Sequence, residues 1–529
     1  MILKKLLPLA FSSAIFISGA LCSAQDIKGS EEQMYRPNFH FTPKNNWMND
    51  PNGLFYANGS YHLYFQYWPY GNKWGPMHWG HATSKDLVKW EEQPIALYPD
   101  RFGYIFSGSA VLDEKNTSGF GDGKTAPVVA IFTYHDPVKE KAGAIDVESQ
   151  GLAYSLDNGY TWTKYDVGNP VIKNPGIRDF RDPKVTWDNV HNQWIMVLAA
   201  QDRSQLYVSK NLKDWNYLSD FGKNIGAHGG VWECPDFFPI KVEGTGETKW
   251  VLIQSLNPGG ANGGSGTQYF VGDFDGKTFT LDKAFAERVT KEKAVWLDYG
   301  KDNYAGVTWG NAPLKNDRRA MIGWMSNWEY AEVVPTNGWR SSTTIPRELK
   351  LVKKGKDYMV ITSPAEALKN YIEKTDSQKK VAVKGTTILS AKDKNDFTKA
   401  DISFTVQGLK QDIYTFTFTN DAGETLSFGI NNKEQNLFVD RSKSSNVSTF
   451  HKFTATPSKA VLGEVQKSGT FRILMDKTSI ELFYNDGETV MTEIFFTSKP
   501  FNTFSASAAS PFTISELNIN QLKFNNTNN

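Results

Sequence analysis

Three acidic residues stand in local settings that suit acid–base chemistry. These are Asp50 in Trp47-Met-Asn-Asp-Pro-Asn-Gly53, Asp182 in Phe180-Arg-Asp-Pro183, and Glu233 in Trp232-Glu-Cys-Pro-Asp-Phe-Phe238. Each motif alone is ordinary, because Asp-Pro and Pro-Asn-Gly are common turn sequences and most acids are solvated. Aromatic neighbours can raise the pKa of one carboxyl, however, while an adjacent Arg keeps another ionised. Hydrolysis of a glycosidic bond requires two carboxyls in such opposed states.

Other chemistries find little support in the sequence. His78 and His81 are three residues apart in a predicted strand, so they face opposite sides of a sheet and cannot hold one metal ion together. No His partners Cys234 in sequence, and we expect this thiol to pack behind Glu233 rather than react. The sequence therefore predicts an enzyme with no metal and no cofactor.

The elements that must position these acids are predicted to be strands. Short alternating runs such as Gly59 to Tyr67 recur between Gly, Asn, Asp and Pro, and helical periodicity is nearly absent. A loose repeat is found at Ser84-Lys-Asp-Leu-Val-Lys-Trp90, Ser155-Leu-Asp-Asn-Gly-Tyr-Thr-Trp162, Ser209-Lys-Asn-Leu-Lys-Asp-Trp215 and Asp273-Phe-Asp-Gly-Lys-Thr-Phe279. Each copy reads as a strand end, a polar turn and an aromatic residue that opens the next strand. The intervals fit four-stranded propeller blades, and residues 35–349 hold roughly five of them.

A second β domain is predicted after the propeller. Residues 350–385 are rich in Lys and are expected to be a linker with a short helix, capped by Ser363 and with Pro364 at its first position. Alternation resumes over residues 386–524, as in Ile480-Glu-Leu-Phe-Tyr484 before the turn Asn485-Asp-Gly487. This pattern indicates an antiparallel β-sandwich.

Composition narrows the class of partner. The chain has 58 Lys and Arg against 57 Asp and Glu, a net charge of +1, so it has no field that would attract nucleic acid. Beyond the N-terminus no stretch is apolar for long enough to span a membrane. Aromatic residues make up 14% of the chain, and their flat faces suit sugar rings as well as β-sheet cores. A homo-oligomer is an open alternative.

The N-terminus has the order of a secretory signal. Lys4 and Lys5 precede an apolar run from Leu6 to Leu21, and small residues end at Ala24, so residues 1–24 are predicted to be removed. We expect an exported protein, periplasmic or extracellular. A lipid anchor on Cys22 is less favoured, because a lipoprotein signal prefers a small residue in place of Leu21.

Taken in order, these motifs resemble glycoside hydrolase family 32, the invertases, inulinases and levanases. The resemblance is carried by Trp47-Met-Asn-Asp-Pro-Asn-Gly53, Phe106-Ser-Gly-Ser109, Arg181-Asp-Pro183, Glu233-Cys-Pro-Asp236, Asp298-Tyr-Gly300, Gly323-Trp-Met-Ser-Asn-Trp328, Trp339-Arg-Ser341, Ile345-Pro-Arg-Glu-Leu349 and Ile480 to Gly487. It implies a five-bladed β-propeller followed by a β-sandwich, in agreement with the repeat.

The resemblance also implies roles. Asp50 matches the family's nucleophile, Glu233 its general acid/base, and Asp182 the acid that stabilises the transition state, kept ionised by Arg181. Positions that line the fructosyl subsite in the family are matched by Asn49, Gln66, Trp74, Phe106, Ser107, Arg181 and Trp324. Trp74 and Trp324 are open to a second interpretation, as aromatic residues of the blade cores.

The implied activity is a retaining hydrolase that releases fructose from levan or inulin, and from sucrose, with exo action favoured. Three alternatives stay open at this stage: an endo-acting levanase, a fructosyltransferase, and a non-catalytic protein that binds fructan at the cell surface. Intact Asp50, Asp182 and Glu233 argue against the binding protein, because binding alone needs no acid/base beside a nucleophile.

Overall fold

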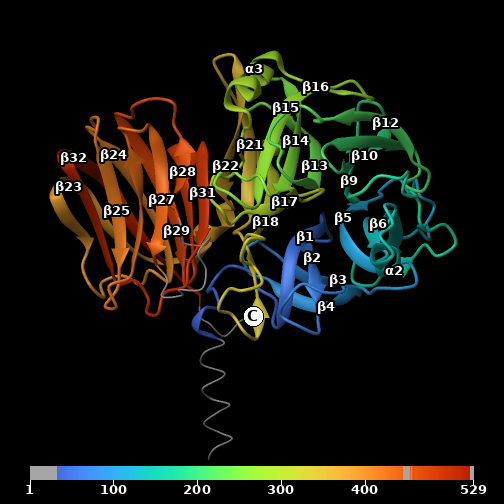
Figure 1. Ribbon diagram of the computed structural model, residues 1–529, viewed down its shortest axis with the longest axis horizontal. Coiled ribbons are helices and arrows are strands. Elements are labelled where there is room, and N and C mark those ends of the chain that lie inside the picture. The colour runs from blue at the N-terminus through green and yellow to red at the C-terminus, as the bar shows by residue number, and fades with distance from the viewer. Residues whose placement is uncertain (1–32, 445–452, 454–455, 525–529) are drawn as a thin grey trace, which may run out of the picture.

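The protein consists of two β modules that lie side by side, as the computed structural model shows (Figure 1). Residues 33–444, 453 and 456–524 are described, so the predicted signal at residues 1–24, with Cys22, lies outside them. The larger module contains five sheets of a β-propeller, and the smaller one is a β-sandwich. The predicted fold class is confirmed.

Each blade of the propeller has four antiparallel strands that follow one another in the chain, the innermost first. The first three blades are β1 (Asn46–Ala57), β2 (Ser60–Trp68), β3 (His78–Ser84) and β4 (Glu91–Leu97); β5 (Tyr104–Leu112), β6 (Val128–His135), β7 (Glu148–Ser155) and β8 (Thr163–Lys164); and β9 (Phe180–Asp188), β10 (Gln193–Ala200), β11 (Ser204–Ser209) and β12 (Asn216–Phe221). A short helix, α2 (Pro137–Lys141), follows β6.

The last two blades close the ring. They are β13 (Val231–Lys241), β14 (Thr248–Asn257), β15 (Gly266–Phe274) and β16 (Phe279–Leu281), followed by α3 (Lys283–Glu292); and β17 (Tyr304–Thr308), β18 (Arg319–Met325), β21 (Arg347–Lys354) and β22 (Asp357–Pro364). Two short strands join the ends of the propeller, because β19 (Trp339–Arg340) pairs with β1 and β20 (Ser342–Thr343) pairs with β18.

The predicted repeat marks one recurring turn of the propeller. Its four copies begin where β3, β7 and β11 end and at the end of β15, and each leads into the fourth strand of its blade. In three of these turns the carboxylate or amide oxygen of Asp86, Asn211 or Asp275 accepts the backbone N–H two residues further on. This local hydrogen bond explains why the turn signal is visible in the sequence.

Apolar side chains fill the space between the blades. The second strands β2, β6, β10 and β14 are buried on both faces over nearly their whole length, because each blade packs between two others. Large aromatic side chains with almost no exposure, among them Trp79, Trp232 and Trp309, contribute much of this core.

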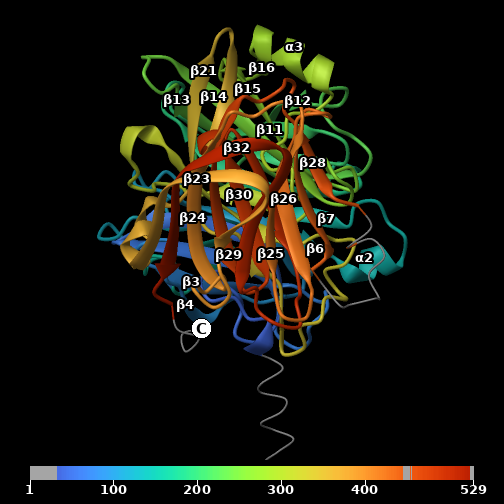
Figure 2. The same cartoon turned by 90° about the vertical axis from the view of Figure 1, so that its left-hand side faces the viewer.

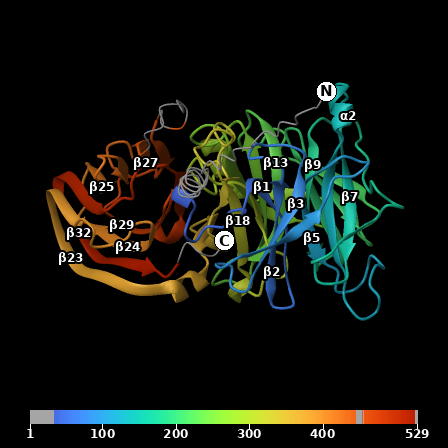
Figure 3. The same ribbon diagram turned by 90° about the horizontal axis from the view of Figure 1, so that it is seen from below.

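The sandwich follows from the alternation predicted for residues 386–524. Its strands are β23 (Ile372–Ser390), β24 (Lys399–Gln407), β25 (Ile413–Thr419), β26 (Thr425–Asn431), β27 (Asn436–Lys443), β28 (Ser458–Val461), β29 (Ser468–Asp476), β30 (Ser479–Tyr484), β31 (Thr489–Ile494) and β32 (Thr503–Leu522). Strand β32 pairs with β25 through its first part and with β24 through its last part, so it belongs to both layers. The strands of these layers face the viewer in Figure 2, and Figure 3 shows β23 and β32 side by side along the outer rim.

The predicted linker at residues 350–385 is wrong. This range contains most of β21 and all of β22, and both strands belong to the fifth blade. It also contains the first part of β23, which belongs to the sandwich. A short 3-10 helix (Glu366–Tyr371) is the connection, and Ser363 and Pro364 do not start it, because they pair with Glu348 and Arg347 in the blade. Lysines on the exposed faces of these strands account for the misleading composition.

Buried charges join the two modules. Arg347 of β21 donates to Asp298 at 2.8 Å and also pairs with Glu481 of the sandwich strand β30. His40, ahead of β1, lies 2.8 Å from Asp476 and 2.7 Å from Glu481. Although burial favours the neutral ring, the two carboxylates raise the pKa of His40 to about 9. The N-terminal segment, the propeller and the sandwich are therefore held in one arrangement.

Candidate active site

The innermost strands of all five blades carry the same irregularity near their N-terminal ends. In each, two residues oppose a single residue of the second strand, which is a β-bulge. The bulged pairs are Asn49 and Asp50, Phe106 and Ser107, Asp182 and Pro183, Cys234 and Pro235, and Ala305 and Gly306. Because the innermost strands converge on the propeller axis, the bulges turn the side chains at these positions toward one place.

The prolines of the motifs now have a physical explanation. Asp50, Asp182 and Cys234 each precede a proline, and in the structure these pairs lie within strands rather than in turns. Proline has no N–H to donate to the ladder, so it is tolerated at a bulge. The interpretation of Asp-Pro as an ordinary turn sequence is therefore wrong for Asp50 and Asp182.

Nine of the ten predicted site residues line one cavity of about 380 Å³. They are Asn49, Asp50, Gln66, Trp74, Phe106, Ser107, Arg181, Asp182 and Glu233. Trp324 is the exception, since it is fully buried and packs on Trp47, Tyr304 and Trp328. Of the two interpretations of Trp324, the position in the structure favours the core aromatic residue over the residue that lines the subsite.

Asp50 is half-buried and lines this cavity. Its Oδ2 accepts a hydrogen bond from the Ser107 hydroxyl at 2.8 Å and a weaker one from the Cys234 sulfur at 3.4 Å. Its Oδ1 has no hydrogen-bond partner among the described residues. Burial and the charge of Glu233 raise the pKa of Asp50 to about 6, and the Ser107 bond opposes this rise.

Asp182 contacts the same sulfur atom. Its Oδ2 accepts the Cys234 backbone N–H at 2.9 Å, and the Cys234 Sγ lies 3.6 Å away. Cys234 thus contacts both carboxyls, whereas the sequence predicted only that it packs behind Glu233. Burial raises the pKa of Asp182 to about 8 against the lowering effect of Arg181, and Glu233 and Asp50 add to the rise.

Arg181 does not pair with Asp182. Its guanidinium contacts Glu148 at 3.0 Å, Asp179 at 2.8 Å and Glu233 at 3.0 Å. The charge of Arg181 lowers the pKa of Asp182, but burial outweighs this effect. The expectation that Arg181 keeps Asp182 ionised is therefore wrong, and the structure makes Arg181 a partner of Glu233.

Glu233 has two strong partners. Arg181 donates to its Oε1, and the hydroxyl of the buried Tyr304 donates to its Oε2. Burial and the charge of Glu233 raise the pKa of Tyr304 well above its usual value, which keeps this hydroxyl protonated as a donor. The side chain of Glu233 is 20% exposed, so it faces the open part of the cavity.

Several residues of the site carried no usable signal in the sequence. The cavity is also lined by His135, Glu140, Glu148, Asp179, Trp328 and Glu332. His135 stacks on Phe106 with ring centroids 4.3 Å apart, and its Nε2 lies 3.1 Å from the carboxylate of Glu140 in α2. Trp328 stands in the same motif as Trp324. Trp324 lies within β18, which ends at Met325, whereas Trp328 follows the strand and lines the cavity.

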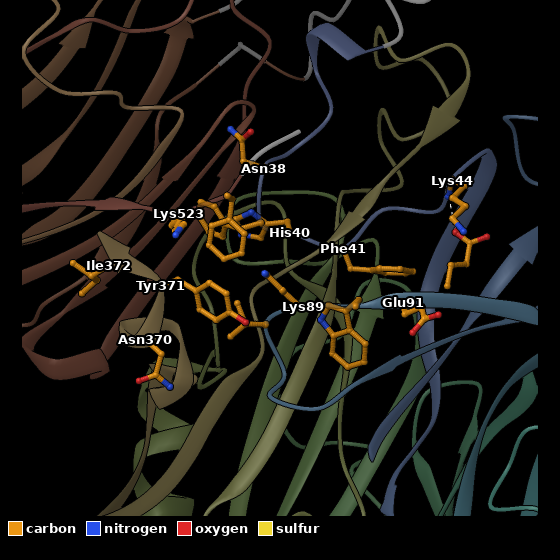
Figure 4. A pocket seen from close by; sticks show the side chains of 15 residues that line it. Asn38, His40, Phe41, Lys44, Lys89, Glu91, Asn370, Tyr371, Ile372 and Lys523 are labelled. Carbon is orange, nitrogen blue, oxygen red and sulfur yellow. Dashed lines mark hydrogen bonds between the residues drawn. The ribbon is translucent and has the colours of Figure 1, made fainter. Parts of the chain in front are cut away.

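A second cavity of about 750 Å³ lies at the junction of the N-terminal segment, the first blade and the sandwich (Figure 4). Its acidic residues, Glu91 and Glu92, are adjacent on β4 and so point to opposite sides of the strand. Glu92 already accepts the Lys44 backbone N–H at 2.7 Å. This cavity does not bring two carboxyls together as the smaller one does.

The arrangement in the smaller cavity suits two-carboxyl chemistry. Asp50 and Glu233 line the same space but have separate partners, so they can hold different protonation states. No group of three His, Cys, Asp or Glu side chains in the described part of the chain is placed to hold a metal ion. Within the same residues no helix is long and apolar enough to cross a bilayer.

Comparison with known protein families agrees with this geometry. The model of the "Glycosyl hydrolases family 32 N-terminal domain" matches residues 40–364, and that of the "Glycosyl hydrolases family 32 C terminal" matches residues 366–521. The chain belongs to glycosyl hydrolase family 32. It is therefore a glycoside hydrolase, and the boundary between the two family models lies at the 3-10 helix that joins the modules.

Family 32 relatives match over most of the chain. A levanase of Bacillus subtilis (strain 168) is 43% identical over 525 residues, which are 98% of this chain and 75% of that protein. An extracellular exo-inulinase of Aspergillus ficuum is 41% identical and covers 88% of this chain and 90% of its own. The crystal structure of an exo-inulinase from Aspergillus awamori superposes with a TM-score of 0.83 at 36% identity, covering 93% of this chain and 98% of that one.

Proposed function

We propose that this family 32 enzyme releases fructose from the ends of fructan chains, and from sucrose, by a retaining double displacement. One observation carries the proposal: Asp50 and Glu233 line the same small cavity, and each has its own set of hydrogen-bond partners. The names of the relatives, levanase and exo-inulinase, support fructan as the substrate class.

In the first step Asp50 attacks the anomeric carbon of a fructosyl unit. The bond to the glycosidic oxygen breaks, and Glu233 gives that oxygen its proton, so the leaving sugar departs neutral. A nucleophile must be ionised. The pKa of Asp50, about 6, lies below that of Asp182, about 8, so Asp50 is the member of this pair that loses its proton first.

In the second step water replaces the enzyme on the anomeric carbon. Glu233 takes a proton from the water, the ester bond to Asp50 breaks, and fructose leaves with its original configuration. Arg181 and the Tyr304 hydroxyl hold the Glu233 carboxyl in place through both steps. Their donation also stabilises the carboxylate that forms after the first proton transfer.

Asp182 has a binding role in this scheme. With a pKa of about 8 it holds a proton at neutral pH, so it can both donate to and accept from sugar hydroxyls. Its position beside Cys234 places it next to Asp50, where the fructosyl unit sits. Gln66, whose buried Nε2 has no partner among the described residues, offers a second donor there.

The size of the cavity favours exo action. Its volume of about 380 Å³ is near the lower end of the ~300–1,000 Å³ common for small-ligand sites. A site of this size accepts a chain end more readily than the middle of a polymer. Export is part of the proposal, because residues 1–24 have the order of a signal and a relative is described as extracellular.

A time course of the products formed from levan, inulin and sucrose tests this function. Chromatography should show fructose as the first and main product at every time point. Early oligosaccharides from a polymer would mean endo cleavage, and oligosaccharides from concentrated sucrose would mean transfer. If none of the three substrates yields product, the proposed substrate class is wrong.

Two variants test the roles of the acids. We expect Asp50→Asn to lower turnover by about four orders of magnitude while sugar binding persists, because an amide cannot form the ester. Glu233→Gln should slow natural substrates far more than a fructoside with an activated leaving group, which needs no proton. Equal losses on both substrates would remove Glu233 from the acid role.

A further inference from the structure

Two exposed tyrosines, Tyr70 and Tyr98, are joined by the rings of Trp68 and the buried His78. The four rings form a chain of contacts. The ring centroid of Tyr70 lies 5.1 Å from that of Trp68 and 6.2 Å from that of His78, and the centroids of His78 and Tyr98 lie 5.5 Å apart. Tyr70 is 75% exposed and Tyr98 is 52% exposed. We call these four residues the aromatic shelf. Neither its two tyrosines nor His78 lines the cavity.

The shelf lies on the same face of the propeller as the cavity. Tyr70 is in the loop between β2 and β3, and Tyr98 follows β4, whereas the site residues lie near the N-terminal end of β1. In an antiparallel blade these three places share one end of the sheet. Trp74, in the same loop as Tyr70, lines the cavity and packs edge-on against Phe106 at 5.9 Å. Gly75, the residue after Trp74, lies against the Trp68 ring, so the shelf adjoins a residue that lines the cavity.

The loop that carries the shelf is held in place. The backbone at Gly71 and Gly75 lies flat on the Trp68 ring, since a Cβ at these positions would come within 3.0 and 2.8 Å of it. The Gly71 carbonyl accepts the Trp47 backbone N–H at 3.0 Å, and Asn72 donates to the Asn337 carbonyl at 2.7 Å. A surface fixed in this way loses little entropy when a ligand binds.

The chemistry of the shelf suits a sugar chain. Its two exposed rings have apolar faces and hydroxyl groups at their edges, a combination that matches the apolar faces and polar rims of sugar rings. Burial and Lys164 lower the pKa of His78, so its ring is neutral at pH 7 and the shelf carries no charge of its own. Neutral polymers fit it better than charged ones.

We propose that the aromatic shelf binds the fructosyl units of a polymeric fructan that lie beyond the unit being cleaved. This inference rests on the proposed function. A chain whose end is in the cavity continues past the residues that line it, and the loop with Trp74 leads from these residues to Tyr70 of the shelf. Sucrose has no units beyond its glucose and does not reach the shelf. The shelf therefore acts on polymers and leaves short substrates unaffected.

The double variant Tyr70→Ala/Tyr98→Ala tests the inference in the full protein. Both rings are exposed, so their loss should leave the unfolding midpoint unchanged, and this is measured first. We expect kcat/KM for long-chain levan or inulin to fall about 5- to 30-fold, mostly through KM, and kcat/KM for sucrose to stay within twofold. The matched control is Tyr217→Ala, because Tyr217 is 53% exposed but lies on β12 of the third blade.

If the double variant hydrolyses polymer as fast as the wild type, the proposal is wrong. Equal losses of activity on polymer and sucrose would also refute it, because they would show an effect on the cavity itself. If the wild type hydrolyses no fructan, the proposed function fails and the shelf is tested separately. Retardation of the protein in a gel containing levan or inulin then decides the matter: equal retardation of wild type and double variant would refute the shelf. If the wild type forms an oligomer in solution and the double variant is a monomer, the shelf is a self-association surface, and sugar binding is refuted.

Discussion

Removal of the Ser107 hydroxyl should move the acid limb of the pH–activity profile to higher pH. The hydroxyl donates to the Oδ2 of Asp50 at 2.8 Å and so stabilises the ionised carboxylate. Burial and Glu233 raise the pKa of Asp50 to about 6, and the Ser107 bond limits this rise. Activity needs ionised Asp50, so it is lost as the pH falls through the pKa of this group. Ser107→Ala removes the bond and raises that pKa further.

The size of the shift follows from the strength of the bond. A hydrogen bond to a charged group contributes about 1.5–3 kcal/mol, and one pKa unit corresponds to about 1.4 kcal/mol. The acid limb should therefore move up by about one to two pH units, from near pH 6 to about pH 7–8. On the plateau above this limb, kcat/KM should fall much less, because Asp50 is ionised there with or without Ser107.

The assay is kcat/KM for sucrose between pH 4.5 and 9, which reports the titration of the free enzyme. Ser109→Ala is the matched control. Ser109 is on the same strand and is also buried, but its Oγ accepts the Val185 backbone N–H at 3.0 Å and does not line the cavity. This control should lower stability and leave the limb in place. A uniform loss of activity at every pH in Ser107→Ala, with the limb unmoved, would refute the assigned role of Asp50 and its partner.

Two further predictions concern His40 and the tryptophan pair Trp324 and Trp328. His40→Ala leaves the buried Asp476 without its cation and leaves Glu481 with Arg347 alone, so the free energy of unfolding at pH 7 should fall by about 3–5 kcal/mol. Because the pKa of His40 is raised to about 9, its contribution to the free energy of unfolding is complete below pH 6.5 and is lost as the pH rises through 9. Denaturant unfolding at pH 10 should therefore show a smaller difference between His40→Ala and the wild type. Trp324→Phe should lower the unfolding midpoint and change KM for sucrose less than threefold, because Trp324 is buried in the core. Trp328→Phe should raise KM for sucrose with little change in the unfolding midpoint, because Trp328 lines the cavity. The reverse pattern would contradict the placement of Trp324 in the core.

Local features of the sequence were enough to predict the blades. The turn after the third strand is built from hydrogen bonds within a few residues, such as Asp86 to Val88, so its signal survives without tertiary contacts. The connection between the modules was predicted less well. Lysines at residues 350–385 suggested a linker, but strand pairing decided their structure, and a pairing partner such as Glu348 for Ser363 depends on the folded blade.

The three acids could be named from their motifs, but their electrostatic partners could not. Arg181 is adjacent to Asp182 in sequence and was expected to be its partner. In the folded protein Arg181 instead contacts Glu233, which is 52 residues away. Tyr304, the other partner of Glu233, comes from a different blade. No spacing rule relates residues that meet only because five strands converge on one axis.

The sequence by itself determined the residue types at the site, the β class of the chain and the number of blades, because these depend on local motifs and on a repeat. Only the tertiary structure decided how the acids differ. Burial raises the pKa values of both Asp50 and Asp182, the Cys234 sulfur contacts both carboxyls, and the bulges of the innermost strands aim them into one cavity. Burial and convergence are properties of the closed ring, since no single blade can enclose a carboxyl.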